Sequence, residues 1–217
     1  MRMSELKRLD DQSPAIQYLQ AKDKHLAKAI QMVGPLEYRL ADNGYGFLVS
    51  QIIGQMLSNK VAAVLTHRLL AQCAGTITAP AVAQLSDDAI RSIGISHSKV
   101  TYIRNLTTAV LDQTVDFARY ATLPDVTVMH ELTAIKGIGN WSAKMYLIFS
   151  LDRPNVLPYE DVAFLQGYGW VYKTTDYTAM AVQKKCRKWQ PYSSIAARYL
   201  YVALDRGLTK APFHLFK

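Results

Sequence analysis

Residues 132–161 read LTAIKGIGNWSAKMYLIFSLDRPNVLPYED, and this stretch decides how the rest of the sequence is interpreted. A helix is expected to end near Ile135, residues 136–139 (KGIG) form a tight turn, and Asn140 is expected to cap a second helix. The two glycines permit positive φ and the close approach of another chain's backbone. The N–H groups at the start of the second helix then form a site for an anion such as phosphate. A plain helix–helix turn that uses glycine only for its geometry is the alternative, and the Gly-x-Gly pattern alone favours that alternative.

The remainder of the chain is predicted to be almost entirely helical. Only VTV at 126–128 and NVL at 155–157 have strand character, and neither has an alternating partner within hairpin range. The helix after the turn is expected to bury Ala143, Tyr146, Leu147 and Phe149. The fold class is therefore all-α. Helices are expected at residues 15–33, 47–73 (one long helix or two in series), 86–94, 98–112, 128–135, 162–172, 177–189 and 192–204.

The composition excludes several classes of protein. The chain has 217 residues, half of them hydrophobic, which suffices for one domain or two intimate lobes and rules out a disordered chain. The N-terminal residues hold no apolar signal core and no stretch could span a bilayer, so an intracellular protein is expected. Lys and Arg number 25 against 17 Asp and Glu, a net charge of +8. That surplus hints at a polyanionic partner but establishes none.

The turn, the helix after it and Asp161, twenty residues beyond Trp141, together resemble the helix-hairpin-helix superfamily of DNA base-excision glycosylases, closest to the 3-methyladenine DNA glycosylase II type. Three further segments match that family in the same order: FLVSQIIGQMLSNKVAA at 47–63, LSDDAIRSIGISHSKVTYIR at 85–104 and WQPYSSIAA at 189–197. The resemblance implies a two-lobed helical bundle with a cleft between the lobes. One lobe would be 41–153, including the hairpin at 132–149, and the other 1–40 with 154–217.

The resemblance implies that Asp161 is the catalytic carboxylate, which faces the bond between sugar and base and stabilises oxocarbenium-like charge. The alternative from local sequence is that Asp161 caps the helix 162–172, and the two roles are compatible. Glu160 is the neighbouring candidate. Relatives that also cut the strand carry a lysine where this chain has Trp141, so no lyase step is expected. Two distant cysteines, Cys73 and Cys186, do not provide an iron–sulfur cluster, and no cofactor is expected.

An alkylated purine is cationic, and the resemblance places Trp141 in the base pocket, where an indole face would attract such a base. The alternative for Trp141 is a core aromatic residue on a helix. Further pocket candidates are Tyr159, Met145, Tyr146 and Trp170. Met145 departs from the family, in which broad-specificity relatives often have an aromatic residue at that position. A second departure is Ser193, where many relatives have arginine.

The residues implied to bind DNA lie in two segments. In the first, the hairpin supplies Gly137, Gly139, Asn140, Ser142 and Lys144, and main-chain carbonyls of Thr133, Ile135 and Ile138 would bind a monovalent cation, Na or K. In the second, Met56 or Leu57 matches the apolar wedge that fills the gap left by a flipped nucleotide, with core packing as the alternative. Lys184, Lys185, Arg187 and Lys188 either line a phosphate track or form a solvated helix face.

The sequence therefore predicts a monofunctional DNA glycosylase that hydrolyses the N-glycosidic bond of alkylated purines in base excision repair. Its partner would be double-stranded DNA with a damaged base, with no membrane and no second copy required. It would act in the nucleoid of a bacterium or the nucleus of a eukaryote. Two alternatives stay open: a DNA-binding helix-hairpin-helix protein without catalysis, and a glycosylase for hypoxanthine, uracil or an oxidised base.

Overall fold

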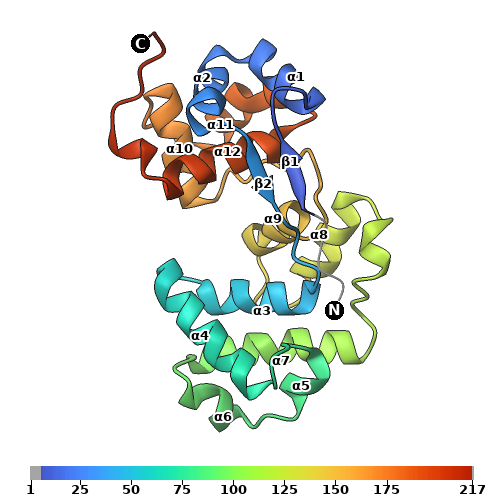
Figure 1. Ribbon diagram of the computed structural model, residues 1–217. Helices are drawn as coiled ribbons and strands as arrows, with labels where there is room; N and C mark the ends of the chain where they lie inside the picture. The colour runs from blue at the N-terminus through green and yellow to red at the C-terminus, as the bar shows by residue number, and fades with distance from the viewer. Residues whose placement is uncertain (1–5, 217) are drawn as a thin grey trace. The chain divides into compact units, whose positions relative to one another are not determined.

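The computed structural model describes residues 6–216, and the chain divides into two compact units (Figure 1). The central unit consists of residues Ala41–Leu151. The terminal unit consists of the residues up to Leu40 together with those from Asp152 onward. Helices predominate in both units, so the predicted all-α class is confirmed. None of the helices in residues 6–216 combines the length and the apolar character needed to cross a bilayer.

The central unit is built around helix α3 (Gly44–Gly54), which packs against α4, α7 and α9. Its apolar residues Leu48, Val49, Ile52 and Ile53 are fully buried, which is the burial expected of a helix in the middle of a core. The other helices of this unit are α4 (Asn59–Gln72), α5 (Ala79–Ala83), α6 (Asp87–Ser92), α7 (His97–Leu111), the 3-10 turn η1 (Arg119–Ala121), α8 (Asp125–Thr133) and α9 (Asn140–Phe149).

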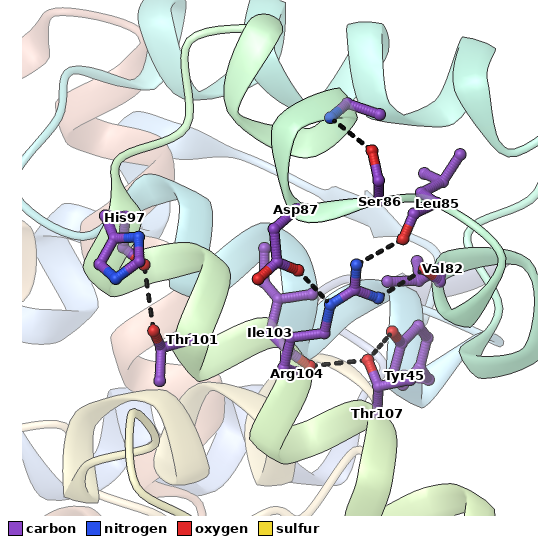
Figure 2. Close-up of polar contacts among 11 residues, drawn as sticks. Tyr45, Val82, Leu85, Ser86, Asp87, His97, Thr101, Ile103, Arg104 and Thr107 are labelled. Atoms are coloured by element: carbon purple, nitrogen blue, oxygen red, sulfur yellow. Dashed lines mark hydrogen bonds and ion pairs between the residues drawn. The ribbon is translucent and has the colours of Figure 1, made fainter.

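Arg104 on α7 fixes the two short helices of the central unit (Figure 2). Its guanidinium donates to the carbonyls of Val82 and Leu85 and to the carboxylate of Asp87, at 2.8 Å from Nε to Oδ1. These acceptors lie at the end of α5 and the start of α6. Ser86 caps α6 as predicted, because its hydroxyl accepts from the Ala89 amide. One planar donor group therefore satisfies backbone carbonyls that a long helix would have paired internally.

The terminal unit has its own core, in which helices α2, α10 and α12 pack together. Trp189, Tyr199, Phe164 and Leu200 are fully buried there. Its elements are strands β1 (Lys7–Leu9) and β2 (Leu36–Tyr38), helices α1 (Pro14–Lys22), α2 (Lys24–Val33), α10 (Val162–Tyr172), α11 (Ala179–Cys186) and α12 (Ser193–Asp205), and the 3-10 turns η2 (Arg187–Trp189) and η3 (Leu208–Lys210).

Two of the expected long helices are each divided in the structure. Residues 15–33 form α1 and α2, because Asp23 takes an extended backbone and its carboxylate accepts from the amides of His25 and Leu26. Such a cap starts a new helix where the hydrophobic spacing alone suggested continuity. Residues 47–73 form α3 and α4, the second of the two predicted arrangements, with residues 55–58 between them.

The two segments with strand character form no strand, as predicted, but one short sheet elsewhere was not predicted. VTV lies inside α8, and NVL forms no strand. The one sheet among the described residues instead pairs β1 with β2, antiparallel, with Arg8 opposite Glu37. Three-residue strands carry too short a pattern to be recognised by alternation. Their pairing is supported by tertiary contacts, including an ion pair from Lys7 to Asp152 at 2.5 Å.

Candidate functional site

The hairpin lies in the central unit, between the end of α8 at Thr133 and the start of α9 at Asn140. The prediction that Asn140 caps α9 is wrong. The capping position is Gly139, which has an extended backbone (φ −95°, ψ 177°), and no side chain caps the helix. Asn140 is the first helical residue and is exposed. A side-chain cap requires an extended backbone at its own position, and the turn ends one residue too early for Asn140 to have one.

Gly137 holds the hairpin against α7. Its φ is +112°, and a Cβ built on it would lie 2.4 Å from the Cβ of Tyr102. The Gly137 carbonyl accepts from Gln55 Nε2 at 2.9 Å, and the Lys136 carbonyl accepts from Asn105 Nδ2 at 2.9 Å. The turn is therefore fixed by side chains from α7 and from the α3–α4 loop. Only glycine combines this backbone conformation with this close contact.

The first turn of α9 is suited to an anion. It contains no acidic residue and no side-chain cap, so the positive end of the helix dipole is not offset there. Gly139 and Asn140 are exposed, Lys144 is half-buried, and Ser142 is buried. Of the predicted DNA-binding residues, these four and Gly137 lie together in this one hairpin. Because the Ser142 side chain is buried, this residue could contact a DNA phosphate only through its backbone N–H.

The same hairpin contains the three carbonyls predicted to bind a monovalent cation. The Ile135 carbonyl accepts from the Ile138 amide at 3.0 Å. Those of Thr133 and Ile138 accept no hydrogen bond from any residue within 6–216. Carbonyl oxygens with open lone pairs are the ligands that Na and K take in proteins. The donor set therefore fits such an ion, and binding stays a prediction.

The predicted wedge residues lie in the loop at 55–58. Met56 has φ +59° and a fully exposed side chain, and Leu57 is 39% exposed. Core packing, the alternative for both residues, is therefore wrong for Met56. Lys99 of α7 donates to the carbonyls of Ile53 and Gln55, at 2.8 and 2.7 Å, and holds the loop in place. A non-glycine residue in the left-handed region costs of order 1 kcal/mol, so an exposed methionine held there is a candidate contact residue.

Asp161 lies in the terminal unit, at the N-cap of α10, as the sequence predicts. Its Oδ1 accepts from the Phe164 amide at 2.7 Å, and the residue is only 8% exposed. Glu160 is exposed. Of the two neighbouring acids, Asp161 is thus the buried one, and its carboxylate caps a helix. The cap leaves further lone pairs on this carboxylate for a second partner.

A further group near this carboxylate is Tyr201 on α12, which the sequence reasoning missed. Burial together with the Asp161 charge raises the pKa of Tyr201 well above its ordinary value. The nearby Arg198 acts in the opposite direction on that pKa. Arg198 is itself buried, paired with Asp152 at 3.2 Å and stacked on the Tyr38 ring at 4.0 Å. The available signal was a Tyr and an Arg three residues apart on an otherwise apolar helix.

The aromatic candidates of the central unit differ in their surroundings. Trp141 is half-buried and is the second residue of α9. Tyr146 is buried among the rings of Phe47, Phe117 and Tyr120, at centroid distances of 6.4, 5.6 and 6.0 Å. Met145 is also buried. Tyr146 and Met145 therefore pack in the core, whereas Trp141 remains the pocket candidate of this unit.

The terminal unit contains the other candidates. Trp170 donates from Nε1 to the Ala211 carbonyl at 2.8 Å and packs on Phe213, so it holds the C-terminal segment. Tyr159 is half-buried beside Asp161 and packs on the terminal core. Ser193, the second departure from the family, donates to Asn155 Oδ1 at 2.8 Å and so supplies a structural contact.

Comparison with known proteins places these features in a family. Residues 49–191 match the HhH-GPD superfamily of base excision DNA repair proteins. The chain belongs to the HhH-GPD superfamily. The match includes the wedge loop, the hairpin and Asp161.

Individual relatives of this HhH-GPD chain cover most of its length. A DNA-3-methyladenine glycosidase structure from Bacillus halodurans is 30% identical, with a TM-score of 0.84 over 96% of this chain and 97% of that one. DNA-3-methyladenine glycosylase 1 of Schizosaccharomyces pombe is 26% identical over 85% of this chain and 84% of its own length. A 3-methyladenine DNA glycosylase from the same yeast, solved with abasic DNA, has the same fold at 24% identity and a TM-score of 0.81.

The hairpin geometry gives a matched pair of variants. Gly137→Ala is expected to unfold at lower temperature and to lose about 1–3 kcal/mol of stability, because the new Cβ is strained and contacts Tyr102. Gly139→Ala, with nothing within 4 Å and an ordinary φ, should change stability by less than about 1 kcal/mol. Thermal and urea unfolding of both variants measure this. Equal losses in the two variants would contradict the assigned role of Gly137.

Proposed function

We propose that this HhH-GPD chain is a monofunctional DNA glycosylase that hydrolyses the N-glycosidic bond of alkylated purines, of the 3-methyladenine type, in base excision repair. The observation that carries the proposal is Asp161, a nearly buried carboxylate fixed by the Phe164 amide at the N-cap of α10. Its relatives are named for 3-methyladenine, which supports the substrate class.

Two roles are assigned to Asp161: electrostatic stabilisation of the transition state and general-base catalysis. Departure of the base leaves positive, oxocarbenium-like character on the sugar, which a fixed carboxylate stabilises without having to reorganise. The same carboxylate orients an attacking water and accepts its proton as the new C–O bond forms. The N-cap contact acts as a positioning contact, because the Phe164 amide holds the carboxylate in one orientation.

Trp141 occupies the position where strand-cutting relatives carry their lysine nucleophile. An indole has no amine to form a Schiff base, so hydrolysis by water is the whole reaction. Its electron-rich face attracts a cationic alkylpurine by a cation–π interaction and by stacking. Alkylation already weakens the glycosidic bond, so a stacking pocket suffices without detailed reading of the base edges.

The partner is double-stranded DNA with a damaged base, which must be turned out of the stack to reach a carboxylate. The first turn of α9 would hold a backbone phosphate through main-chain amides, with a monovalent cation at the carbonyls of Thr133, Ile135 and Ile138. Such contacts position the duplex without reading its sequence. The chain would act as a monomer, in the nucleoid or the nucleus according to its host.

Asp161→Asn tests the catalytic assignment. Asparagine is also a good N-cap, so α10 should be kept, while release of 3-methyladenine from methylated DNA falls by about a hundredfold or more. Chromatography of released bases measures this, with binding to an abasic duplex as the control for folding. Borohydride should trap no covalent DNA adduct with either protein.

The outcome of that assay also distinguishes the glycosylase from a DNA-binding protein without catalysis. Equal base release by wild type and Asp161→Asn would contradict the catalytic role. Tight, salt-dependent DNA binding by the wild type with no base release would support a non-catalytic DNA-binding protein. A panel of duplexes, each with one hypoxanthine, uracil, oxidised base or alkylpurine, assigns the lesion.

Tyr201→Phe tests the positioning of Asp161. Removal of the polar hydroxyl near the carboxylate should lower kcat by roughly 3- to 30-fold with little change in KM. Tyr199→Phe is the control on the same helix, since the charges that act on the pKa of Tyr199 are those of Asp10 and Asp11 and not that of Asp161. A kcat for Tyr201→Phe equal to that of Tyr199→Phe would contradict the assignment.

Met56→Ala and Leu57→Ala distinguish the two wedge candidates. Met56 is the more exposed, so its truncation should leave the melting temperature unchanged and lower kcat/KM by about tenfold, because the gap in the duplex is no longer filled. Leu57→Ala should have the smaller effect. Single-turnover base release from a defined duplex measures both. A larger loss for Leu57→Ala would transfer the wedge role to Leu57.

A further inference from the structure

A cavity of about 990 Å³ lies within the terminal unit, and none of the functions above uses it. Its walls come from the end of α1, the second half of α10, the segment at 173–176, α11 and η2. Asp161 caps the beginning of α10, and Tyr168 is the first residue of that helix to line the cavity. Seven helical residues at about 1.5 Å each separate the two by roughly 10 Å along the helix. The cavity is therefore distinct from the surroundings of the catalytic carboxylate.

The cavity is strongly cationic. Its one acidic lining residue is Asp176, whose Oδ1 accepts from the amide and the hydroxyl of Thr178 at 3.1 and 2.8 Å. Lys188 pairs with the buried Asp23 at 3.1 Å, and it is the only one of the cationic lining residues that takes part in an ion pair in the described part of the chain. The cationic residues are Lys22, Lys173, Lys184, Lys185, Arg187 and Lys188. Such uncompensated charge favours a ligand with several negative charges.

Aromatic rings stand beside these cations. Tyr18, Tyr168 and Tyr172 line the cavity. The Tyr172 hydroxyl donates to Asp23, which also accepts from Trp189 Nε1 at 2.9 Å, so this ring is held in one orientation. Lys185 Nζ lies 4.7 Å and Lys188 Nζ 5.4 Å from the Tyr172 ring centroid. A fixed aromatic surface next to cationic groups suits a ligand that has both a flat ring and an anionic part.

We propose that this cavity binds a nucleotide, with its phosphates at Lys184, Lys185 and Arg187 and its base against the half-buried rings of Tyr18 and Tyr172. The cavity lies at the upper end of the usual range for small-molecule sites, about 300–1,000 Å³, and inorganic phosphate would leave the rings unused. A base within a duplex is stacked on its neighbours and cannot reach the rings. The ligand is thus an unstacked nucleotide, either free or part of a single strand.

Calorimetric titration of the full chain tests the proposal with three probes: deoxyadenosine triphosphate, inorganic triphosphate and a short oligothymidylate strand. The double variant Lys184→Gln/Lys185→Gln should bind nucleotide about tenfold or more weakly than wild type at fixed salt. Lys60→Gln/Lys210→Gln removes the same charge from two exposed lysines outside the cavity and should bind as wild type does. Release of 3-methyladenine by the wild type, measured alongside, tests the glycosylase assignment separately, and its failure would not affect the nucleotide titration.

The three probes distinguish a free nucleotide from a nucleotide within a single strand. Tighter binding of the triphosphate nucleotide supports a free nucleotide, and tighter binding of the strand supports single-stranded nucleic acid. Inorganic triphosphate that binds as tightly as both would overturn the nucleotide assignment, because the rings then add nothing. No binding by the wild type, or an equal loss in the two double variants, would overturn the site.

Discussion

The bond from the Phe164 amide to Asp161 Oδ1 is the contact on which the proposed chemistry depends. A carboxylate removed from water is costly unless hydrogen bonds replace its hydration. Here the start of α10 supplies a donor together with the favourable end of its dipole. The same contact also fixes the orientation of the carboxylate. The helix cap that local sequence predicts for Asp161 is therefore compatible with the catalytic role proposed for it.

The hairpin would bind its ligand, a phosphate, through backbone groups rather than through side chains. Gly137 brings the turn into contact with Tyr102, and donors from Gln55 and Asn105 satisfy two of its carbonyls. Because the first turn of α9 has no capping side chain, its N–H groups are kept for an external acceptor. Lys99 holds the neighbouring wedge loop through two carbonyls. The hairpin and the wedge loop of the central unit are therefore both held through their backbone carbonyls.

Much of this arrangement could be predicted from the sequence, because its signals are local. The limits of α10, the caps at Ser86 and Asp161 and the glycine turn each follow from residues within one helical turn. Long-range contacts could not be predicted in this way. Tyr201 lies forty residues from Asp161, and only the packing of α12 on α10 brings them together. The division at Asp23 was missed because hydrophobic spacing continues through it, and the cap of α9 was misplaced by one residue because the turn is tighter than the glycine pattern implies.

The positions of the cationic side chains change how the net positive charge of the chain is interpreted. A phosphate held by main-chain amides needs no lysine, so the net charge of +8 is not explained by the hairpin. Six of the cationic side chains instead line one cavity of the terminal unit, beside rings that a duplex would not use. Charge placed only to attract DNA would need neither a concave site nor a tyrosine fixed by a buried carboxylate. The concave shape, the uncompensated charge and the fixed ring together favour the proposed second ligand. Because the folded unit already holds these side chains in place, binding would lose little further conformational entropy.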